Sequence, residues 1–436
     1  MGSVVHVAVT PVGVRGMKIL NREKFLRNIV VPILKVSEEK VSKVRPICKN
    51  YLLKLENFKP IQTIKTNDEN SSKVIHLNPE KINKWADITE VDRQSLFTNG
   101  ITEKEFQLKE MQVTYDHFKY DEVFKAVLPD NEETVSGFSQ IGHIIHLNLR
   151  EHHLDYKQLI GQVLIDKIKT CRTVVNKNDV IDNTYRNFSM EIIAGIEDYI
   201  VTVKENSCRF QFDFSKVYWN PRLGKEHERI IKMLRQGDVL FDVFCGVGPF
   251  SIPAAKCKCI VFANDLNPES YKWLNHNAKR NKVNMSLFKS YNLDGKDFIC
   301  SIFKDYITDL CNCKQILEKG AKIHVTMNLP AMAVDFLKYF KGLITDKSLV
   351  EKFNYDIFVH VYCFVIGDDP IKLAEQLVKD NIGSDMSIDF VSTFNVRNVS
   401  PKKEMIRVTF KLTKNIIFGL KEAVEPCEPP IKKICT

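Results

Sequence analysis

Two glycines and one carboxylate stand where they could bind a nucleoside. Gly246 and Gly248 lie in the pattern D-x-F-x-G-x-G-x-F after a short apolar run, and Asp265 follows the next apolar run. Glycines let the backbone approach a ligand closely, and a carboxylate after the second strand can accept hydrogen bonds from ribose hydroxyls. The loop has no P-loop lysine and lacks the third glycine of a dinucleotide site. It indicates a nucleoside site, and the alternative is a tight turn with a structural role only.

Polar side chains follow four predicted strands of this region. They are Asp242, Asp265, Asp294 and Asn328. In open α/β sheets ligands bind outside the carboxyl ends of the strands. We therefore expect these four side chains to meet in one crevice.

A βαβ unit has to position these residues. The runs Val239–Phe241 and Cys259–Ala263 predict buried parallel strands, and the apolar pattern between them predicts a helix through Ala255. The alternation continues along the chain, which predicts a doubly wound α/β sheet. Further strands are expected at 285–288, 322–327, 355–364, 388–394 and 405–412, helices at 268–280 and 371–379, and a turn at 292–295.

The preceding sequence predicts smaller mixed elements. A short helix is expected at Glu23–Val30, ended by Pro32, and a longer one at 156–169. Strand-like runs at 190–193, 199–203 and 209–214 follow, the last two joined as a hairpin at 205–207. The loop 218–227 is either a wall of the site or an interdomain linker, and a helix is expected from 225 to 234. The lysines at 59, 65, 73, 81 and 84 form either a solvated face or a phosphate contact.

Composition limits the classes of protein. The 436 residues are 44% hydrophobic and 27% charged, with 63 basic and 54 acidic residues giving a net charge of +9. This excess permits a polyanionic partner without requiring one. The 12 cysteines form no C-x-x-C pair, so we expect no zinc site, and the histidines at 143, 146, 152 and 153 are interpreted as structural. No apolar run approaches 18 residues, so no membrane span is expected.

The two ends of the chain carry their own signals. Residues 1–16 contain Arg15 and no acid, which is compatible with part of a mitochondrial presequence, and Met17 offers an internal start. Two compartment classes would follow: the mitochondrial matrix, and the nucleus and cytoplasm. The proline-containing tail from Glu422 is expected to be disordered.

Several strings resemble known families. The glycine loop resembles the adenosylmethionine loop of class I methyltransferases, and Asn328-Leu329-Pro330 resembles the [ND]-P-P motif of amino-directed nucleic-acid methyltransferases. From about Lys125 to Leu412 the chain resembles the eukaryotic and archaeal tRNA (guanine-37-N1)-methyltransferases. The resemblance rests on NPRLGKEHERI, DVFCGVGPFSIPAA, ANDLNPES, NLPAMAVDFL, IGHIIHLNLREHHLDYK, NTYRNFSMEIIAG and VRNVSPKKEM; Cys245 departs from a usual alanine, and the last string from VRDVAPNKEM.

This resemblance implies a fold and a division into domains. It implies a Rossmann-like class I methyltransferase domain, with a mostly parallel sheet and an antiparallel C-terminal strand, preceded by two smaller α+β domains. The expected ranges are a candidate targeting segment at 1–16, a tRNA-recognition domain at 17–126, a middle domain at 127–215, the methyltransferase domain at 216–415 and a tail at 416–436.

The resemblance also implies an activity. It implies methyl transfer from S-adenosyl-L-methionine to N1 of guanosine 37 in tRNA, 3′ of the anticodon. Apart from the resemblance, we expect a monomer and no metal. Glu226 would be the base and Arg186 the cation on O6, although by local pattern alone both look like ordinary surface residues. Tyr218 and Asn328 would position the guanine beside Pro330. The family's cofactor contacts fall on His227, Asp265, Leu266, Asp294, Gly295 and Asn328, in addition to Asp242, Gly246 and Gly248.

Three other readings stay open on the sequence. A sister family transfers the aminocarboxypropyl group of the same cofactor to a wybutosine precursor in tRNA. A small-molecule or protein methyltransferase would not need the additional N-terminal domains. A non-catalytic tRNA-binding protein could use the same scaffold, although the intact glycine loop and the four strand-end residues argue against it.

Overall fold

The chain divides into two compact units, each described by itself. The computed structural model describes residues 11, 13–64, 72–129, 135, 137–181, 188–384 and 386–420. The first unit comprises Met1–Asn178 and Met190–Glu197, and the second Asp179–Ser189 and Asp198–Thr436. The expected boundary at 126/127 lies inside the first unit, and the expected boundary at 215/216 lies inside the second.

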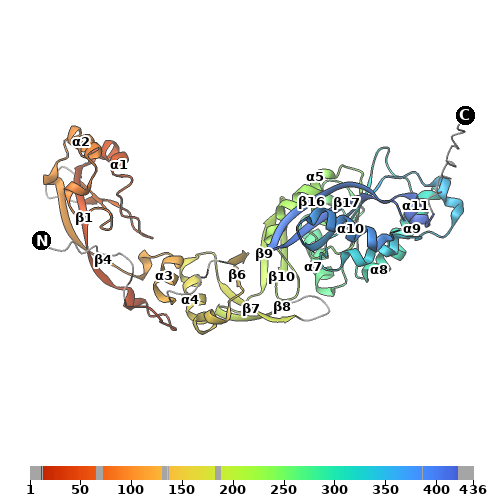
Figure 1. Cartoon of the computed structure of the whole chain (residues 1–436), viewed down its shortest axis with the longest axis horizontal. Coiled ribbons are helices and arrows are strands. Elements are labelled where there is room, and N and C mark those ends of the chain that lie inside the picture. Colours follow the sequence, from red (N-terminus) through yellow and green to blue (C-terminus); the bar gives the residue numbers. More distant parts are fainter. Residues whose placement is uncertain are drawn as a thin grey trace, which may run out of the picture. The chain divides into compact units, whose positions relative to one another are not determined.

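The first unit begins with a four-stranded antiparallel sheet in the order β2-β3-β1-β4. Helices α1 and α2 belong to the same part of the unit, and residues of both enter its apolar core with β1 and β3 (Figure 1). The bounds are β1 Arg27–Ser37, α1 Val41–Cys48, β2 Ile61–Ile64, β3 Ser72–His76, α2 Glu90–Thr98 and β4 Phe106–Val113.

The helix expected at Glu23–Val30 was a wrong prediction. A single 3₁₀ turn, Arg22–Phe25, is capped by the Asn21 side chain, and the chain then enters strand β1. Ile29, Val31 and Ile33 are buried at every second position, which is the period of a strand. Pro32 lies opposite Leu108 of β4, and its carbonyl accepts a hydrogen bond from the Leu77 N–H just beyond β3. Its missing N–H therefore falls at the end of the β1–β3 ladder, which begins at Ile33.

The remainder of the first unit is a second mixed layer. A four-stranded sheet has the order β5-β6-β7-β8, and β6 and β7 run parallel. Helix α4 confirms the helix expected at 156–169, and its buried residues share one core with Phe25, Val113 and Phe124. The bounds are α3 Tyr120–Val127, β5 Phe138–Ile141, β6 Ile144–Leu147, α4 Lys157–Lys167, β7 Thr173–Ile181 and β8 Phe188–Gly195.

The second unit contains a seven-stranded sheet in the order β13-β12-β11-β14-β15-β17-β16. The first five strands are parallel, and β17 pairs antiparallel with both β15 and β16. Helices α6 and α7 pack near β11–β13, and α10 packs on β15 and β17. The α/β class and the antiparallel C-terminal strand are thereby confirmed.

The helices and strands of the second unit, several of which are labelled in Figure 1, have the following bounds. They are β9 Ile200–Glu205, β10 Cys208–Asp213, α5 Gly224–Met233, β11 Val239–Asp242, α6 Ser251–Lys256, β12 Ile260–Asn264, α7 Pro268–Arg280, β13 Phe288–Tyr291, α8 Gly295–Phe298, α9 Lys304–Cys311, β14 Ile323–Met327, β15 Ile357–Ile366, α10 Pro370–Ile382, β16 Asp389–Ser400, β17 Lys403–Lys411 and α11 Lys414–Phe418.

Two local expectations in this unit have different outcomes. The hairpin at 205–207 is confirmed, since β9 and β10 pair antiparallel and Asn206 and Ser207 have φ of 46° and 60°, as a primed hairpin turn requires. The strand expected at 285–288 was wrong in position, because β13 begins at Phe288 and continues to Tyr291. The first residues of the expected strand, among them the exposed Met285, precede the sheet.

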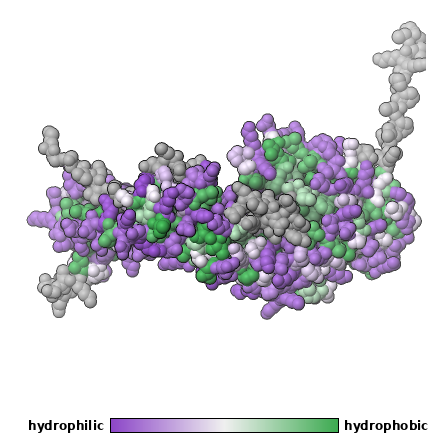
Figure 2. Space-filling model, turned by 90° about the horizontal axis from the view of Figure 1, so that it is seen from below, coloured by the Kyte–Doolittle hydropathy of each residue, from purple (hydrophilic) through white to green (hydrophobic). Residues whose placement is uncertain are grey.

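Much of the visible surface is hydrophilic. Hydrophilic side chains cover much of the face in Figure 2, with smaller hydrophobic areas among them. Across the described ranges, no helix has the length and apolarity that crossing a membrane would require.

Candidate active site

A cavity of about 380 Å³ opens at the carboxyl edge of the seven-stranded sheet. This volume falls in the range of small-molecule sites. The cavity brings together residues from the loop before α5, the glycine loop and the ends of β12 and β14. The residues predicted from the sequence that line it are Tyr218, His227, Gly246, Asp265, Asn328 and Pro330.

The two glycines of the loop have different reasons to be glycine. Gly246 has a φ of 55°, and a Cβ atom added there would meet nothing within 4 Å, so the backbone faces open space in the cavity. Gly248 has a φ of 97°, and its Cβ would lie 2.7 Å from Leu274 Cδ1. Gly246 therefore exposes backbone to a ligand, whereas Gly248 allows the loop to pack on α7.

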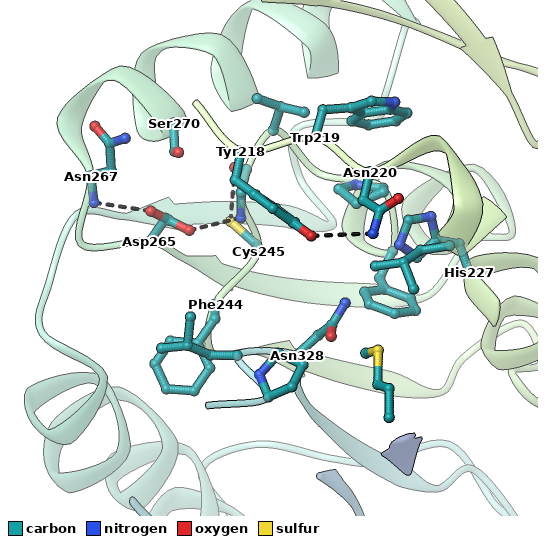
Figure 3. A pocket seen from close by; sticks show the side chains of 18 of the residues that line it. Tyr218, Trp219, Asn220, His227, Phe244, Cys245, Asp265, Asn267, Ser270 and Asn328 are labelled. Atoms are coloured by element: carbon teal, nitrogen blue, oxygen red, sulfur yellow. Dashed lines mark hydrogen bonds between the residues drawn. The ribbon is translucent and has the colours of Figure 1, made fainter. Parts of the chain in front are cut away.

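Asp265, which follows β12, binds the glycine loop and holds it in place. Its carboxylate accepts hydrogen bonds from the backbone N–H groups of Gly246 (2.8 Å) and Asn267 (2.9 Å), the second of which Figure 3 shows. Burial raises the pKa of Asp265, and the hydrogen bonds from Asn267, Gly246 and Ser270 oppose that shift. Each carboxylate oxygen can accept further bonds, so the site fits the ribose hydroxyls of a nucleoside.

Asn328 and Tyr218 approach the cavity from opposite sides (Figure 3). The Oδ1 atom of Asn328 is buried and has no hydrogen-bond partner in the described part of the chain. Tyr218 is 56% exposed, and its hydroxyl accepts a hydrogen bond from Asn220 Nδ2 at 3.2 Å. A buried acceptor without a donor is costly, so Asn328 indicates a ligand that donates a hydrogen bond.

His227 is fixed from behind by a carboxylate. Its Nδ1 lies 2.6 Å from Glu205 Oε1, and its ring packs edge-on against Phe250 at 4.7 Å. A Cβ atom on Gly224 would lie 3.0 Å from Glu205 Oε2, so the glycine at the start of α5 makes room for this carboxylate. The imidazole is thus held in one orientation in the cavity wall.

Glu226 lies beside His227 in sequence but points elsewhere. Successive residues of a helix project about 100° apart, so His227 faces the cavity while Glu226 faces β15 and β17. Its Oε1 accepts hydrogen bonds from Arg407 (2.7 Å) and Tyr362 (2.9 Å), and its Oε2 is paired with Arg229. Only 2% of Glu226 is exposed, so the reading of an ordinary surface residue was wrong. This environment also raises the pKa of Tyr362, through burial and the nearby Glu226 charge.

Other predicted site residues lie outside the cavity lining. Asp242 is buried below the loop, where it accepts hydrogen bonds from Ser251 (2.5 Å) and Thr326 (2.9 Å), and burial raises its pKa to about 6. Asp294 caps α8 through the Lys296 N–H, and Leu266 is 45% exposed. Asp242 therefore supports the sheet edge, so the four strand-end residues do not all meet in the crevice.

Gly295 supports the wall from behind. Its Cβ position lies 2.8 Å from Phe244 Cε1, and Phe244 lines the cavity. A larger residue at 295 would therefore displace this ring. Arg186 lies outside the described residues.

The sequence did not reveal Asn264, which orders the ends of three strands. Its Nδ2 donates to the carbonyls of Val243 (3.1 Å) and Leu293 (3.0 Å), and its Oδ1 accepts from the Leu293 N–H (2.9 Å). Asn292 completes the arrangement by donating to the carbonyls of Asp265 and Leu266. The only signal in the sequence was an amide at the end of a buried strand.

The donor set fits an adenosylmethionine-type nucleoside. Asp265 supplies a carboxylate, Gly246 an open stretch of backbone, and Asn328 an unpaired acceptor. Within the described ranges, no group of three or more His, Cys, Asp or Glu residues is placed to hold a metal ion.

The sheet order, the glycine loop and the carboxylate after β12 define a class I methyltransferase. Residues 201–381 match the TRM5/TYW2 methyltransferase domain, and residues 120–198 match the TYW2 N-terminal domain. The chain is 48% identical to the tRNA (guanine(37)-N(1))-methyltransferase of Drosophila melanogaster, covering 94% of this chain and 88% of that protein. It is 42% identical to that of Homo sapiens, covering 97% and 82%. The chain belongs to the tRNA (guanine(37)-N(1))-methyltransferase family.

A solved structure supports the same fold. Trm5b from Pyrococcus abyssi is 24% identical to this chain, with a TM-score of 0.59 over 87% of this chain and 98% of that one.

Proposed function

We propose that this chain transfers a methyl group from S-adenosyl-L-methionine to N1 of guanosine 37 in tRNA. Relatives that carry this activity in their names are 42–48% identical over most of the chain. The observation that carries the proposal is one cavity that holds Asp265, suited to a nucleoside cofactor, together with Asn328, a buried acceptor without a partner.

The cofactor supplies an electrophilic methyl group when it is bound. Asp265 would accept hydrogen bonds from the ribose hydroxyls, Gly246 would let the backbone approach the nucleoside closely, and His227 would form part of the cavity wall. Leu266, Asp294 and Gly295 act around this pocket: Asp294 caps α8, and Gly295 backs Phe244. Asp265, Gly246 and His227 would hold the cofactor, and the residues around them would support the cavity wall, with the methyl group directed towards Asn328.

The nucleophile has to be created in the site. Neutral guanine carries a proton on N1 and has no free lone pair there in the plane of the ring. Glu226 removes this proton and Arg186 stabilises the negative charge on O6, while Tyr218, Asn328 and Pro330 hold the base. Removal of the proton and in-plane positioning of N1 are the two tasks of these side chains.

The described conformation sets a condition on this role of Glu226. Its two carboxylate oxygens are bound by Arg229, Arg407 and Tyr362, and the residue is absent from the cavity lining. Proton transfer needs hydrogen-bond reach to N1. Glu226 must therefore rotate out of this cluster when the guanine is in place.

The second candidate is aminocarboxypropyl transfer to tRNA. The matching family model is shared between TRM5 and TYW2, and residues 120–198 match a TYW2 domain. The same cofactor pocket serves both reactions, because the transferred group differs and the nucleoside does not. The mass of the modified nucleoside distinguishes methyl transfer from aminocarboxypropyl transfer.

Cellular location and oligomeric state belong to the same proposal. We place the protein in the mitochondrial matrix as well as the nucleus and cytoplasm, on the basis of the acid-free, arginine-containing start and the internal Met17. It acts on tRNA as a monomer. Fluorescent fusions starting at Met1 and at Met17 would show different compartments, and identical distributions would contradict the two-product proposal.

The activity is tested on transcript tRNA with guanosine 37. Incubation with the protein and methyl-labelled S-adenosyl-L-methionine should yield 1-methylguanosine on nucleoside mass spectrometry. The matched control is the same tRNA with adenosine at position 37, which should take no label. An aminocarboxypropyl product, or no product, would overturn the proposal.

A further inference from the structure

Arg397 lines the cavity from a strand to which no role has been assigned. It lies on β16, half-buried, and is the only lysine or arginine among the described residues that line the cavity. The side chains around it, Phe364, Val399 and Met405, are apolar and also line the cavity.

The pairing of β16 explains how Arg397 reaches this position. The register with β17 is irregular on both sides of Arg397, between Asn395 and Arg397 and between Asn398 and Ser400. Bulges of this kind turn side chains and are common beside active sites. Arg397 and Val399 are two positions apart on β16, and both line the cavity.

The register also places Arg397 on the substrate side. Arg397 pairs with Met405, Met405 pairs with Phe364, and the Phe364 N–H donates to the Pro330 carbonyl at 3.1 Å. Arg397 therefore lies in one row with Pro330, the wall beside the guanine. Asp265, which holds the cofactor end, follows β12, near the other end of the sheet.

The guanidinium has capacity left for a ligand. Its Nε donates to the carbonyl of the adjacent Asn398 at 3.3 Å, and no carboxylate within the described ranges forms an ion pair with it. Arg229 and Arg407, in contrast, are both paired with Glu226. Arg397 thus offers two terminal nitrogens and an uncompensated positive charge beside an apolar wall.

We propose that Arg397 binds a phosphate flanking the target guanosine. This rests on the proposed function, since a base that enters the cavity leaves its own phosphodiesters at the rim. A planar guanidinium can bind two phosphate oxygens at once. Arg397 is half-buried at the edge of the cavity, in the row of Pro330, where such a phosphate lies. The contact fixes the nucleotide that carries the base and leaves the cofactor untouched.

The test pairs Arg397→Gln with tRNAs that carry a neutral methylphosphonate at the phosphate 5′ or 3′ of guanosine 37. On unmodified tRNA, Arg397→Gln should weaken affinity about 10-fold to 100-fold, as loss of a charge-assisted hydrogen bond does. On the tRNA whose methylphosphonate replaces the phosphate that Arg397 binds, the affinities of wild type and Arg397→Gln should differ by less than about 2-fold. Arg397→Lys should fall between, because it keeps the charge without the planar fork.

Two further measurements complete the test. S-adenosyl-L-methionine affinity should be the same in wild type and Arg397→Gln, which shows that the cavity is intact. Lys372→Gln, on the exposed face of α10, should change neither affinity. Coupling to one of the two phosphates supports the proposal. Absence of coupling to both, or a loss of cofactor affinity with unchanged tRNA affinity, would overturn it while the methylation of guanosine 37 stayed measurable.

Discussion

At the scale of single residues, Asp265 has two tasks in the site. It anchors the glycine loop through the Gly246 N–H, and it presents a carboxylate to the cavity. Asp265→Ala removes both, and we expect cofactor affinity to fall about 10-fold to 100-fold, since 1.5–3 kcal/mol is typical of a lost charged hydrogen bond. Asp265→Asn is the matched control because it keeps one acceptor oxygen. Calorimetry that finds unchanged affinity for the alanine variant would contradict the cofactor assignment.

Glu226 is the residue whose substitution tests the chemistry. Glu226→Gln keeps the size and an acceptor for Tyr362 and Arg407 but cannot take up the N1 proton. General-base catalysis typically contributes about 10²–10⁴-fold, so single-turnover methylation should slow by that factor. Affinities for tRNA and cofactor, measured alongside, should stay near those of wild type. A near-normal rate would mean that the proton leaves by another route.

The surroundings of Glu226 also show where sequence analysis stops. The motif around Glu226 pointed to its role through family resemblance, yet the hydrogen-bond partners Tyr362 and Arg407 are 136 and 181 residues further along the chain. No local pattern relates positions that distant, because only the sheet register brings β15 and β17 beside α5. Asp242 illustrates the opposite error: its place at a strand end was predicted, but its side chain turns inward to Ser251 and Thr326.

At the scale of elements, the prediction succeeded where burial sets a simple pattern. The central strands β11, β12 and β14 are buried almost throughout; β11 and β12 appear in the sequence as apolar runs that end in one polar residue, and β14 as an apolar stretch that contains His324 and Thr326. The prediction failed for β1, whose first residues were included in a helix expected at Glu23–Val30, and for β13, which has only one fully buried residue. Mixed exposure removes the apolar signal on which both predictions relied.

The same sheet contains a buried pair of histidines that should make its stability depend on pH. His324 Nδ1 lies 3.0 Å from His360 Nε2, and His360 Nδ1 lies 3.0 Å from Thr409 Oγ1, across β14, β15 and β17. Burial lowers the pKa of His324 to about 4, and burial also holds the pKa of His360 well below its usual value. Below its usual pKa of about 6.5 each histidine binds protons more readily in the unfolded chain, so stability falls as pH decreases from about 6.5 to 4.

A comparison of variants isolates this effect. The raised pKa of Asp242 acts in the opposite direction between about 4 and 6, so the wild-type curve alone is not diagnostic. His324→Gln should lose part of the pH dependence, on the order of 2–3 kcal/mol between pH 6.5 and 4 by urea unfolding. His276→Gln, at an exposed position on α7, is the control. Parallel curves for wild type and His324→Gln would refute a role for the pair.

At the scale of the whole molecule, the core defines where the chain can be divided. A recognition domain ending at 126 was expected, but Val113 and Phe124 share one apolar core with Leu159 and Val163. Removing residues 17–126 would uncover that core and leave the rest of the first unit unstable. The second unit has its own core on the seven-stranded sheet, so the informative cut is at Asp198.

A chain of residues 198–420 should therefore keep the cofactor cavity and lose most of its affinity for tRNA. All the described residues that line the cavity lie within this range, so calorimetry should find S-adenosyl-L-methionine affinity within about 3-fold of the full chain, a difference of roughly 0.65 kcal/mol. If the first unit contacts phosphates, its removal should also reduce the slope of log affinity against log salt, by about 0.7–0.9 for each lost contact. Full-length chain with Asp265→Ala is the complementary control, since it should lose cofactor affinity and keep the salt slope. Should residues 198–420 bind tRNA with unchanged affinity and slope, the first unit would have no part in tRNA recognition.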